Sequence, residues 1–499
     1  MTLTVLVTGA SGYIGGRLVP RLLAEGHAVR AMTRDAGRLR DVPWADQVQV
    51  VEADALGGLD DLDAALAGVD VAYYLVHSIG QGAAFEQTDR LAAQAFGAAC
   101  TRAGVGRIVY LGGLTASHEV LSPHLASRAE VGQVLLDSGV PTVVLQAAVI
   151  IGSGSASFEM LRYLTERLPA MITPKWVNSR IQPIAVRDVL RYLVGAATLP
   201  REVSRRFDIG GPEVLTYLEM MQRYARVAGL RKRLILPVPL LTPRLSGHWV
   251  NIVTPVPAAL AKPLVRSLVN EVVCSEDDVR AIIPDPPEGL LGFEDAVGLA
   301  LLRIKEAAVE TRWSSATWPG APSDPLPTDP DWAGGSLYED RRVRQVDAEP
   351  QDLWRVIEGI GGEHGWYSFP LAWAVRGQLD KLVGGVGLNR GRRDPDQLYV
   401  GESLDFWRVE EIVDGQLLRL RAEMKVPGAA WLELSVETDG QGRTLFVQRA
   451  LFHPRGLAGH AYWWSVWPFH GVVFGGMLAN IAGAAHRAGA QRRAAARAA

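Results

Sequence analysis

The first third of the chain alternates short apolar runs with segments of helical spacing. The apolar runs are residues 3–6, 28–32, 48–52, 69–75, 107–111 and 142–145. Strands alternating with helices indicate right-handed crossover connections, because parallel strands cannot be joined by a tight turn. The pattern predicts an α/β fold, a doubly wound parallel sheet with helices on both faces.

After residue 151 the alternation loosens, and residues 234–273 become apolar and rich in proline. In doubly wound sheets the ligand lies beyond the carboxyl ends of the strands, where later segments can cover it. We therefore expect residues 213–290 to cover a substrate site. The alternatives are a structural helical appendage and a surface that docks on a membrane.

Residues 313–335 contain repeated prolines with glycine and serine, which indicates an extended linker. Beyond it, a helix over 350–360 precedes an alternating pattern and a long apolar helix. The strands predicted from this pattern are 398–406, 410–413, 417–424, 430–437 and 443–452, with hairpin turns at Asp414-Gly415 and Asp439-Gly440. This second pattern predicts an α+β domain. The expected division is a domain at 1–310, a linker at 311–336, a domain at 337–490 and a basic tail at 491–499.

The first strand leads into Thr8-Gly9-Ala10-Ser11-Gly12-Tyr13-Ile14-Gly15, followed by an amphipathic helix over 17–25. Three glycines at this spacing permit a tight turn, a close approach of backbone to a pyrophosphate, and close packing of helix on strand. The anion then lies on the free N–H groups and positive dipole end of the helix. We predict a dinucleotide site rather than a plain glycine turn, with contacts from Gly9, Ser11, Gly12, Tyr13, Ile14 and Gly15.

The second strand ends in Met32-Thr33-Arg34-Asp35. Arg34 can pair with the 2′-phosphate of NADP, whereas an acidic residue at the strand end binds the ribose hydroxyls of NAD. We expect NADP, with NAD as the alternative because Asp35 follows directly. Asp54 and Ala55 follow the third strand, where a carboxylate can accept from the adenine amino group; the alternative is an Asp that caps a turn.

These motifs resemble the short-chain dehydrogenase/reductase superfamily, in particular its atypical, NmrA-like and complex I subunit-like branches. The resemblance covers residues 1–305 and includes the segments 74–78, 124–132, 242–246 and 253–257. It implies an N-terminal Rossmann domain that binds NAD(P). The second half, with 453–456 before Tyr462-Trp463-Trp464, is similar to an uncharacterised START-like (polyketide cyclase-like) helix-grip domain.

The chain departs from the superfamily at its proton relay. Members use a Tyr and a Lys four residues later, whereas the corresponding stretch here has His124 and Arg128. Arg128 stays protonated but can hold a ribose or phosphate, so we expect it to bind the cofactor. His124 is a candidate proton donor near neutral pH; the alternative is a structural or exposed histidine.

Two further residues are catalytic candidates through the resemblance. His77 follows an apolar strand, on the loop that faces the nicotinamide in the resembled fold, and can donate to the cofactor or to a substrate oxygen. Thr115 lies where the superfamily places a hydroxyl that orients the substrate. The alternatives are a hydrogen-bonded loop histidine and a capping threonine.

The C-terminal domain is dense in aromatic residues, most of which we expect to form its core. A helix across a curved sheet also encloses a cavity, and apolar pockets with few polar groups are the usual ligand sites. We expect a hydrophobic small molecule there, with Arg455, His460 and His470 as polar candidates.

Composition narrows the classes of partner. The 499 residues include 51 basic and 54 acidic side chains, which gives a formal charge of -3. The chain therefore lacks the net positive charge with which proteins attract nucleic acid. Its two cysteines, Cys100 and Cys274, lack metal-binding spacing and suit a reducing compartment without zinc. With no apparent secretory leader, we expect a cytoplasmic location and no metal.

Segment 461–485 is the most apolar, but Pro468, His470 and Asn480 interrupt it, so we expect a buried helix rather than a membrane span. The tail at 486–499 can touch an anionic surface, although a frayed, solvated helix end is the simpler interpretation. Peripheral contact with a membrane is therefore left open, as is the oligomeric state.

We predict an NAD(P)H-dependent oxidoreductase that reduces a hydrophobic carbonyl, quinone or enone. The cofactor supplies the hydride. A quinone or enone relaxes the need for the missing Tyr, because a delocalised oxyanion can be protonated by water or His124. The alternatives are a non-catalytic NADP(H) redox or ligand sensor and a membrane-surface assembly factor.

Overall fold

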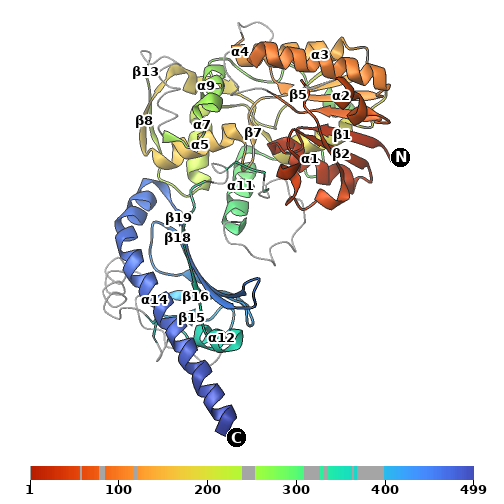
Figure 1. The fold of residues 1–499 in the computed structure, drawn as a ribbon. Coiled ribbons are helices and arrows are strands. Elements are labelled where there is room, and N and C mark those ends of the chain that lie inside the picture. Colours follow the sequence, from red (N-terminus) through yellow and green to blue (C-terminus); the bar gives the residue numbers. More distant parts are fainter. Residues whose placement is uncertain are drawn as a thin grey trace. The chain divides into compact units, whose positions relative to one another are not determined.

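The structure is a computed structural model. It describes residues 2–56, 59–77, 85–115, 121–238, 253–307, 326, 328–330, 335–361, 365–367 and 398–498. The chain forms two compact units, Met1–Gly335 and Ser336–Ala499 (Figure 1).

The N-terminal unit is built on a seven-stranded parallel sheet (Figure 1). Its strands, in spatial order, are β11 (Arg205–Ile209), β6 (Thr142–Ala147), β5 (Arg107–Gly113), β4 (Val71–Tyr74), β1 (Thr4–Thr8), β2 (Ala28–Thr33) and β3 (Gln49–Glu52). The strand order reverses between β1 and β4, which is where doubly wound sheets bind their ligands. The predicted fold class is confirmed.

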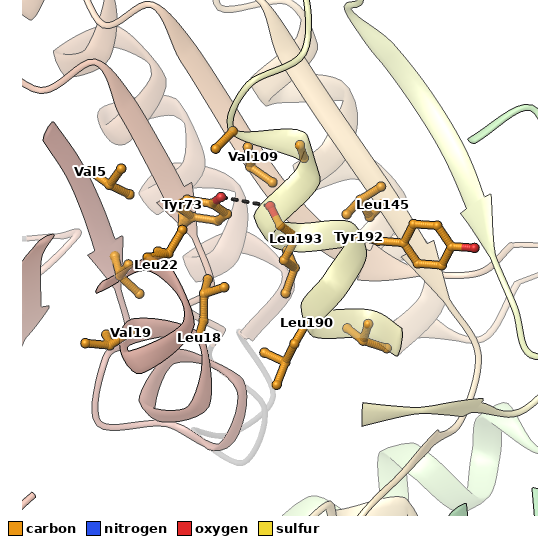
Figure 2. Close-up of a cluster of buried hydrophobic side chains, with 14 of the residues drawn as sticks. Val5, Leu18, Val19, Leu22, Tyr73, Val109, Leu145, Leu190, Tyr192 and Leu193 are labelled. Atoms are coloured by element: carbon orange, nitrogen blue, oxygen red, sulfur yellow. Dashed lines mark hydrogen bonds between the residues drawn. The ribbon is translucent and has the colours of Figure 1, made fainter. Parts of the chain in front are cut away.

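Helices cover both faces of this sheet because each crossover carries one. On one face, α1 (Tyr13–Ala24) and α6 (Val186–Ala196) bury their apolar stripes against β1, β4, β5 and β6. Figure 2 shows this layer, in which the buried Tyr73 hydroxyl donates to the carbonyl of Leu193 at 2.8 Å. The other face packs against α2 (Leu59–Leu66), α3 (Phe85–Ala103) and α4 (Pro123–Leu136).

A second layer of the same unit lies beyond the sheet. It contains α5 (Ala156–Arg167), α7 (Tyr217–Val227), α9 (Ala258–Ser267) and α11 (Phe293–Ala307), which share an apolar core. A two-stranded sheet of β8 (Ala170–Pro174) and β13 (Leu234–Val238) lies beside them. Much of the segment predicted to cover a substrate site forms this layer.

In the residues that the structure describes, the C-terminal unit is a six-stranded antiparallel sheet with two helices on one face. Its strands, in spatial order, are β14 (Tyr338–Gln345), β19 (Thr444–Pro454), β18 (Gly428–Thr438), β17 (Leu417–Ala422), β16 (Trp407–Val413) and β15 (Ser403–Leu404). Helices α12 (Pro350–Glu358) and α14 (Gly456–Ala498) share the core with the even-numbered side chains of β18. The predicted antiparallel α+β arrangement is confirmed.

The expectation of a buried apolar helix over 461–485, rather than a membrane span, holds for one side of the helix only. Helix α14 buries Met477 and Ile481, but Trp464 is 61% and Phe469 66% exposed. One helix against one sheet buries a single side, whatever the composition of its other side. No helix in the described part of the chain is long and apolar enough to cross a membrane.

Part of the predicted linker packs on the N-terminal unit. Leu326 and Asp329 form a turn in which the Asp329 N–H donates to the Leu326 carbonyl at 2.9 Å. The Asp329 carboxylate accepts two bonds from Arg17 of α1, at 2.9 and 2.6 Å. This turn is therefore a packed part of the unit and not a free spacer.

Candidate functional site

The loop between β1 and α1 has the geometry of an anion site. Gly9 adopts a φ of +63°, a left-handed conformation that favours glycine. A Cβ on Gly15 would lie 2.3 Å from the Gly9 carbonyl oxygen, so loop and helix approach as only glycine allows. Helix α1 begins at Tyr13, earlier than predicted, and its N-cap Gly12 has no side chain to cap the first turn. The N–H groups of that turn are thus available to an anion.

A crevice of about 440 Å³ lies at the carboxyl ends of β1, β2, β3 and β4. The predicted cofactor residues that line it are Gly9, Ser11, Gly12, Arg34, Asp54, Ala55 and His77. Tyr13, Ile14, Gly15 and Arg128 are not among its lining residues. The Tyr13 side chain turns away, and its buried hydroxyl has no hydrogen-bond partner among the described residues.

The end of β2 presents two arginines to this crevice, Arg34 and Arg38. Asp35 also lines the crevice, and its carboxylate accepts the Gly37 N–H at 2.9 Å and caps the short helix Ala36–Leu39. Arg38 was missed in the sequence analysis, although a basic residue one turn after Arg34 was a usable signal. The crevice therefore offers two guanidinium groups where the sequence predicted one.

Asp54 also lines the crevice, in the turn after β3. Its Oδ1 accepts the Leu56 N–H at 3.1 Å, which is the turn-capping role considered from the sequence. Capping uses one carboxylate oxygen and does not prevent the adenine contact, so both interpretations fit the geometry.

His77, His124 and Arg128 come together although they are distant in sequence. His77 follows β4, and the other two lie on the first turns of α4. Burial, and after it the positive charge of Arg128, lower the pKa of His124 to about 3. Burial, Arg128 and His124 also lower the pKa of His77, although the residue is exposed where it lines the crevice. Both imidazoles are therefore neutral at pH 7.

A second, apolar pocket of about 120 Å³ has His124 in its wall. It lies between the ends of β5 and β6 and the helices α5, α7 and α9. Its apolar lining includes Leu114, Met160, Leu164, Met220, Met221, Leu264 and Leu268. His124 lines this pocket and His77 lines the crevice, and the two spaces lie at the carboxyl ends of the neighbouring strands β5 and β4.

Thr115 lines neither space. Its hydroxyl lies 3.4 Å from the side-chain nitrogen of Gln146, at the end of β5. This contact agrees with the structural role that was the alternative for Thr115. Of the three catalytic candidates, His77 and His124 are the two that line a pocket.

Comparison with known proteins agrees with this geometry. Residues 9–148 match the family described as NAD(P)H-binding, and residues 332–477 match the family "Protein of unknown function (DUF2867)". The N-terminal unit contains an NAD(P)H-binding domain. The other unit contains a DUF2867 domain.

Two curated relatives are similar to the NAD(P)H-binding half. One is a (4-alkanoyl-5-oxo-2,5-dihydrofuran-3-yl)methyl phosphate reductase of Streptomyces griseus, 27% identical over 45% of this chain and 74% of the relative. Another is a ceramide reductase of Caulobacter vibrioides, 27% identical over 53% of this chain and 84% of the relative. The chain is thus related in sequence to reductases.

A solved structure of triphenylmethane reductase from Citrobacter sp., complexed with NADP(H), is also similar. It is 21% identical and covers 60% of this chain and 99% of its own, with a TM-score of 0.48.

Proposed function

We propose that this protein is an NADPH-dependent reductase of an apolar carbonyl, quinone or enone. The observation that carries the proposal is that the crevice and the apolar pocket lie at the carboxyl ends of the neighbouring strands β4 and β5, with His77 lining the first and His124 the second. Its direct test is NADPH oxidation by the full chain, followed in a stopped-flow instrument with a panel of quinones, enones and aldehydes. Tight cofactor binding without turnover of any of them would remove the claim of catalysis.

The preference for NADPH follows from Arg34 and Arg38. Each guanidinium can donate charge-assisted bonds to the 2′-phosphate, and such bonds contribute about 1.5–3 kcal/mol each. We expect Arg34→Ser and Arg38→Ser each to raise the Kd of NADPH by about tenfold to a hundredfold, and to leave that of NADH nearly unchanged. Calorimetry with both nucleotides measures the two changes.

Arg40→Ser is the matched control for this experiment. Arg40 is exposed on the same turn but does not line the crevice. Its loss should leave both affinities as they are. Equal weakening of NADPH and NADH by the Arg34 and Arg38 variants would contradict a role in 2′-phosphate recognition.

His124 is the residue we assign to the substrate oxygen. When bound, the nicotinamide supplies a hydride. The pKa of His124 lies far below 7, so its imidazole is neutral and cannot act as the proton donor predicted from the sequence. We assign it the role of a hydrogen-bond donor. A neutral imidazole N–H aimed at a carbonyl oxygen stabilises the negative charge that develops there. The positive charge of Arg128 also stabilises this negative charge. Water supplies the proton that the substrate oxygen finally takes up.

This assignment predicts the pH dependence of the reaction. We expect kcat/KM to be flat from pH 5 to 8, because His124 stays neutral above a pKa of about 3. An imidazolium donor would instead lose activity as the pH rises through about 6.5. His124→Ala should lower kcat by about a hundredfold, as removal of one oxyanion donor does.

His124→Gln retains an N–H donor and should recover part of the lost rate, whereas His486→Ala, on the surface of the C-terminal unit, should change nothing. A wild-type kcat/KM that falls as the pH rises through about 6.5 would argue for acid catalysis by imidazolium.

For the DUF2867 domain we propose the START-like, ligand-binding role. Its support is the packing of α14 along one face of the antiparallel sheet (Figure 1). His460 and His470 of α14 contact Tyr338 and Asp340 of β14, at 2.8 and 3.5 Å. Native mass spectrometry of the purified chain would reveal a copurifying hydrophobic molecule, and a protein that never carries one would count against this role.

A further inference from the structure

The small sheet of the N-terminal unit presents an apolar face to solvent. Its strands β8 and β13 run parallel, with Leu236 opposite Ile172 and Leu234 opposite Ala170, so these side chains share one face (Figure 1). Ile172 is 60%, Leu234 62% and Leu236 55% exposed. Single apolar side chains are common on protein surfaces, but a cluster on one face indicates contact with another apolar surface.

The opposite face of this sheet belongs to the core. Met171 of β8 is buried, and Ile235, its neighbour in the register, packs against the same apolar cluster as α5 and α7. Side chains alternate between the two faces of a strand. The packing of one face therefore holds Ile172, Leu234 and Leu236 outward, at positions where a sheet face open to water usually carries polar residues.

Positive charge flanks this apolar face. Arg231 and Lys232 lie just before β13, Lys175 directly follows β8, and all three are exposed. Residues 220–270 contain eight Arg and Lys and no Asp or Glu, and residues 167–187 contain four and none, although the whole chain has a formal charge of -3. The basic residues are thus concentrated in the segments that carry the exposed aliphatic side chains.

We propose that this face and its flanking cations dock on an anionic lipid membrane. The aliphatic side chains enter the boundary between headgroups and acyl chains, and the cations contact lipid phosphates. Protein interfaces are enriched in aromatic residues and depleted in lysine at their centres, whereas this face has aliphatic residues beside Lys175 and Lys232. This composition favours a lipid surface over a protein partner.

The same sheet leads into the wall of the apolar pocket. Strand β8 ends at Pro174 and continues directly into the short helix Lys175–Asn178, whose Trp176 lines the pocket. An apolar substrate concentrates in a bilayer, so docking here brings the pocket to its supply. That supply of substrate rests on the reductase function proposed above, whereas the docking does not.

Flotation of the full chain with lipid vesicles tests the docking. We expect binding to vesicles of equal parts phosphatidylglycerol and phosphatidylcholine, weaker binding at high salt, and none to phosphatidylcholine alone. Leu234→Ser/Leu236→Ser should weaken binding by about tenfold or more, because less apolar area leaves water. Arg231→Ser/Lys232→Ser should weaken it by about fivefold for each lost cation.

Each double variant has a matched control on the same unit. Leu91→Ser/Leu299→Ser removes two exposed leucines from α3 and α11, and Arg40→Ser/Arg201→Ser removes two exposed arginines from other surface segments. Neither control should change the binding to anionic vesicles.

The proposal is overturned if anionic vesicles do not carry the protein, if both vesicle types carry it equally, or if the test variants bind as well as their controls. A dimer in sedimentation velocity that Leu234→Ser/Leu236→Ser dissociates would assign the face to a second copy of the chain instead. Failure of the reductase function looks different. In that case the wild type floats with anionic vesicles, yet oxidises NADPH with no quinone, enone or aldehyde.

Discussion

Gly15→Ala is expected to weaken NADPH binding by about a hundredfold or more while the protein stays folded. The added Cβ would lie 2.3 Å from the Gly9 carbonyl oxygen and 2.9 Å from its carbon, both backbone atoms. Neither can rotate away, so the loop and α1 must separate. Each N–H that loses a phosphate oxygen forfeits about 1.5–3 kcal/mol, and two such losses exceed a hundredfold in Kd.

Calorimetry with NADPH measures this loss, and a thermal unfolding scan shows whether the variant is folded. Gly298→Ala is the control, since a Cβ there meets nothing within 4 Å on helix α11. Gly12→Ala should be milder, because its Cβ would lie 3.1 Å from the Gly9 oxygen and touch nothing else. A folded Gly15→Ala protein with wild-type affinity would contradict the anion site at this loop.

The elements that local chemistry determines were predictable from the sequence. A few consecutive residues suffice to recognise the glycine loop, the alternating strands and the hairpin at Asp414-Gly415. The structure contains the parallel and antiparallel sheets that these patterns predict. Strand β14 was missed, because an edge strand with charged side chains lacks the apolar run that marks a buried one. The exposed side of α14 was not predicted either. Its apolar composition suggested burial all round, but composition does not say which side of a helix packs against a sheet.

The site was predictable only in part, because much of it is assembled across long sequence separations. His77 and His124 were each singled out, but their proximity depends on the adjacency of β4 and β5 in the sheet. The apolar pocket joins β5, α5, α7 and α9, and no local sequence pattern marks the residues that line it. The low pKa of His124 likewise depends on burial that the sequence does not state.

Asp329→Ala is expected to lower the free energy of unfolding of the N-terminal unit by about 3 kcal/mol. The Arg17 side chain is 3% exposed and that of Asp329 11%, so the mutation leaves a buried guanidinium without its carboxylate. The remaining contacts of Arg17 offset only part of this cost. Among the described residues they include a bond to the Tyr13 carbonyl at 3.1 Å and the Tyr13 ring, whose centroid lies 4.3 Å from the guanidinium carbon.

Urea unfolding of the full chain, followed by a probe in the N-terminal unit, gives this free energy. The double variant Arg17→Met/Asp329→Leu should recover most of the loss, because apolar groups of similar volume often replace a buried ion pair without penalty. Asp63→Ala is the control: it breaks the Arg102–Asp63 pair, 2.7 Å long but open to solvent on both sides, and should change stability little. If Asp329→Ala matched Asp63→Ala, the turn at Leu326 and Asp329 would be a loosely attached linker rather than a packed part of the NAD(P)H-binding unit.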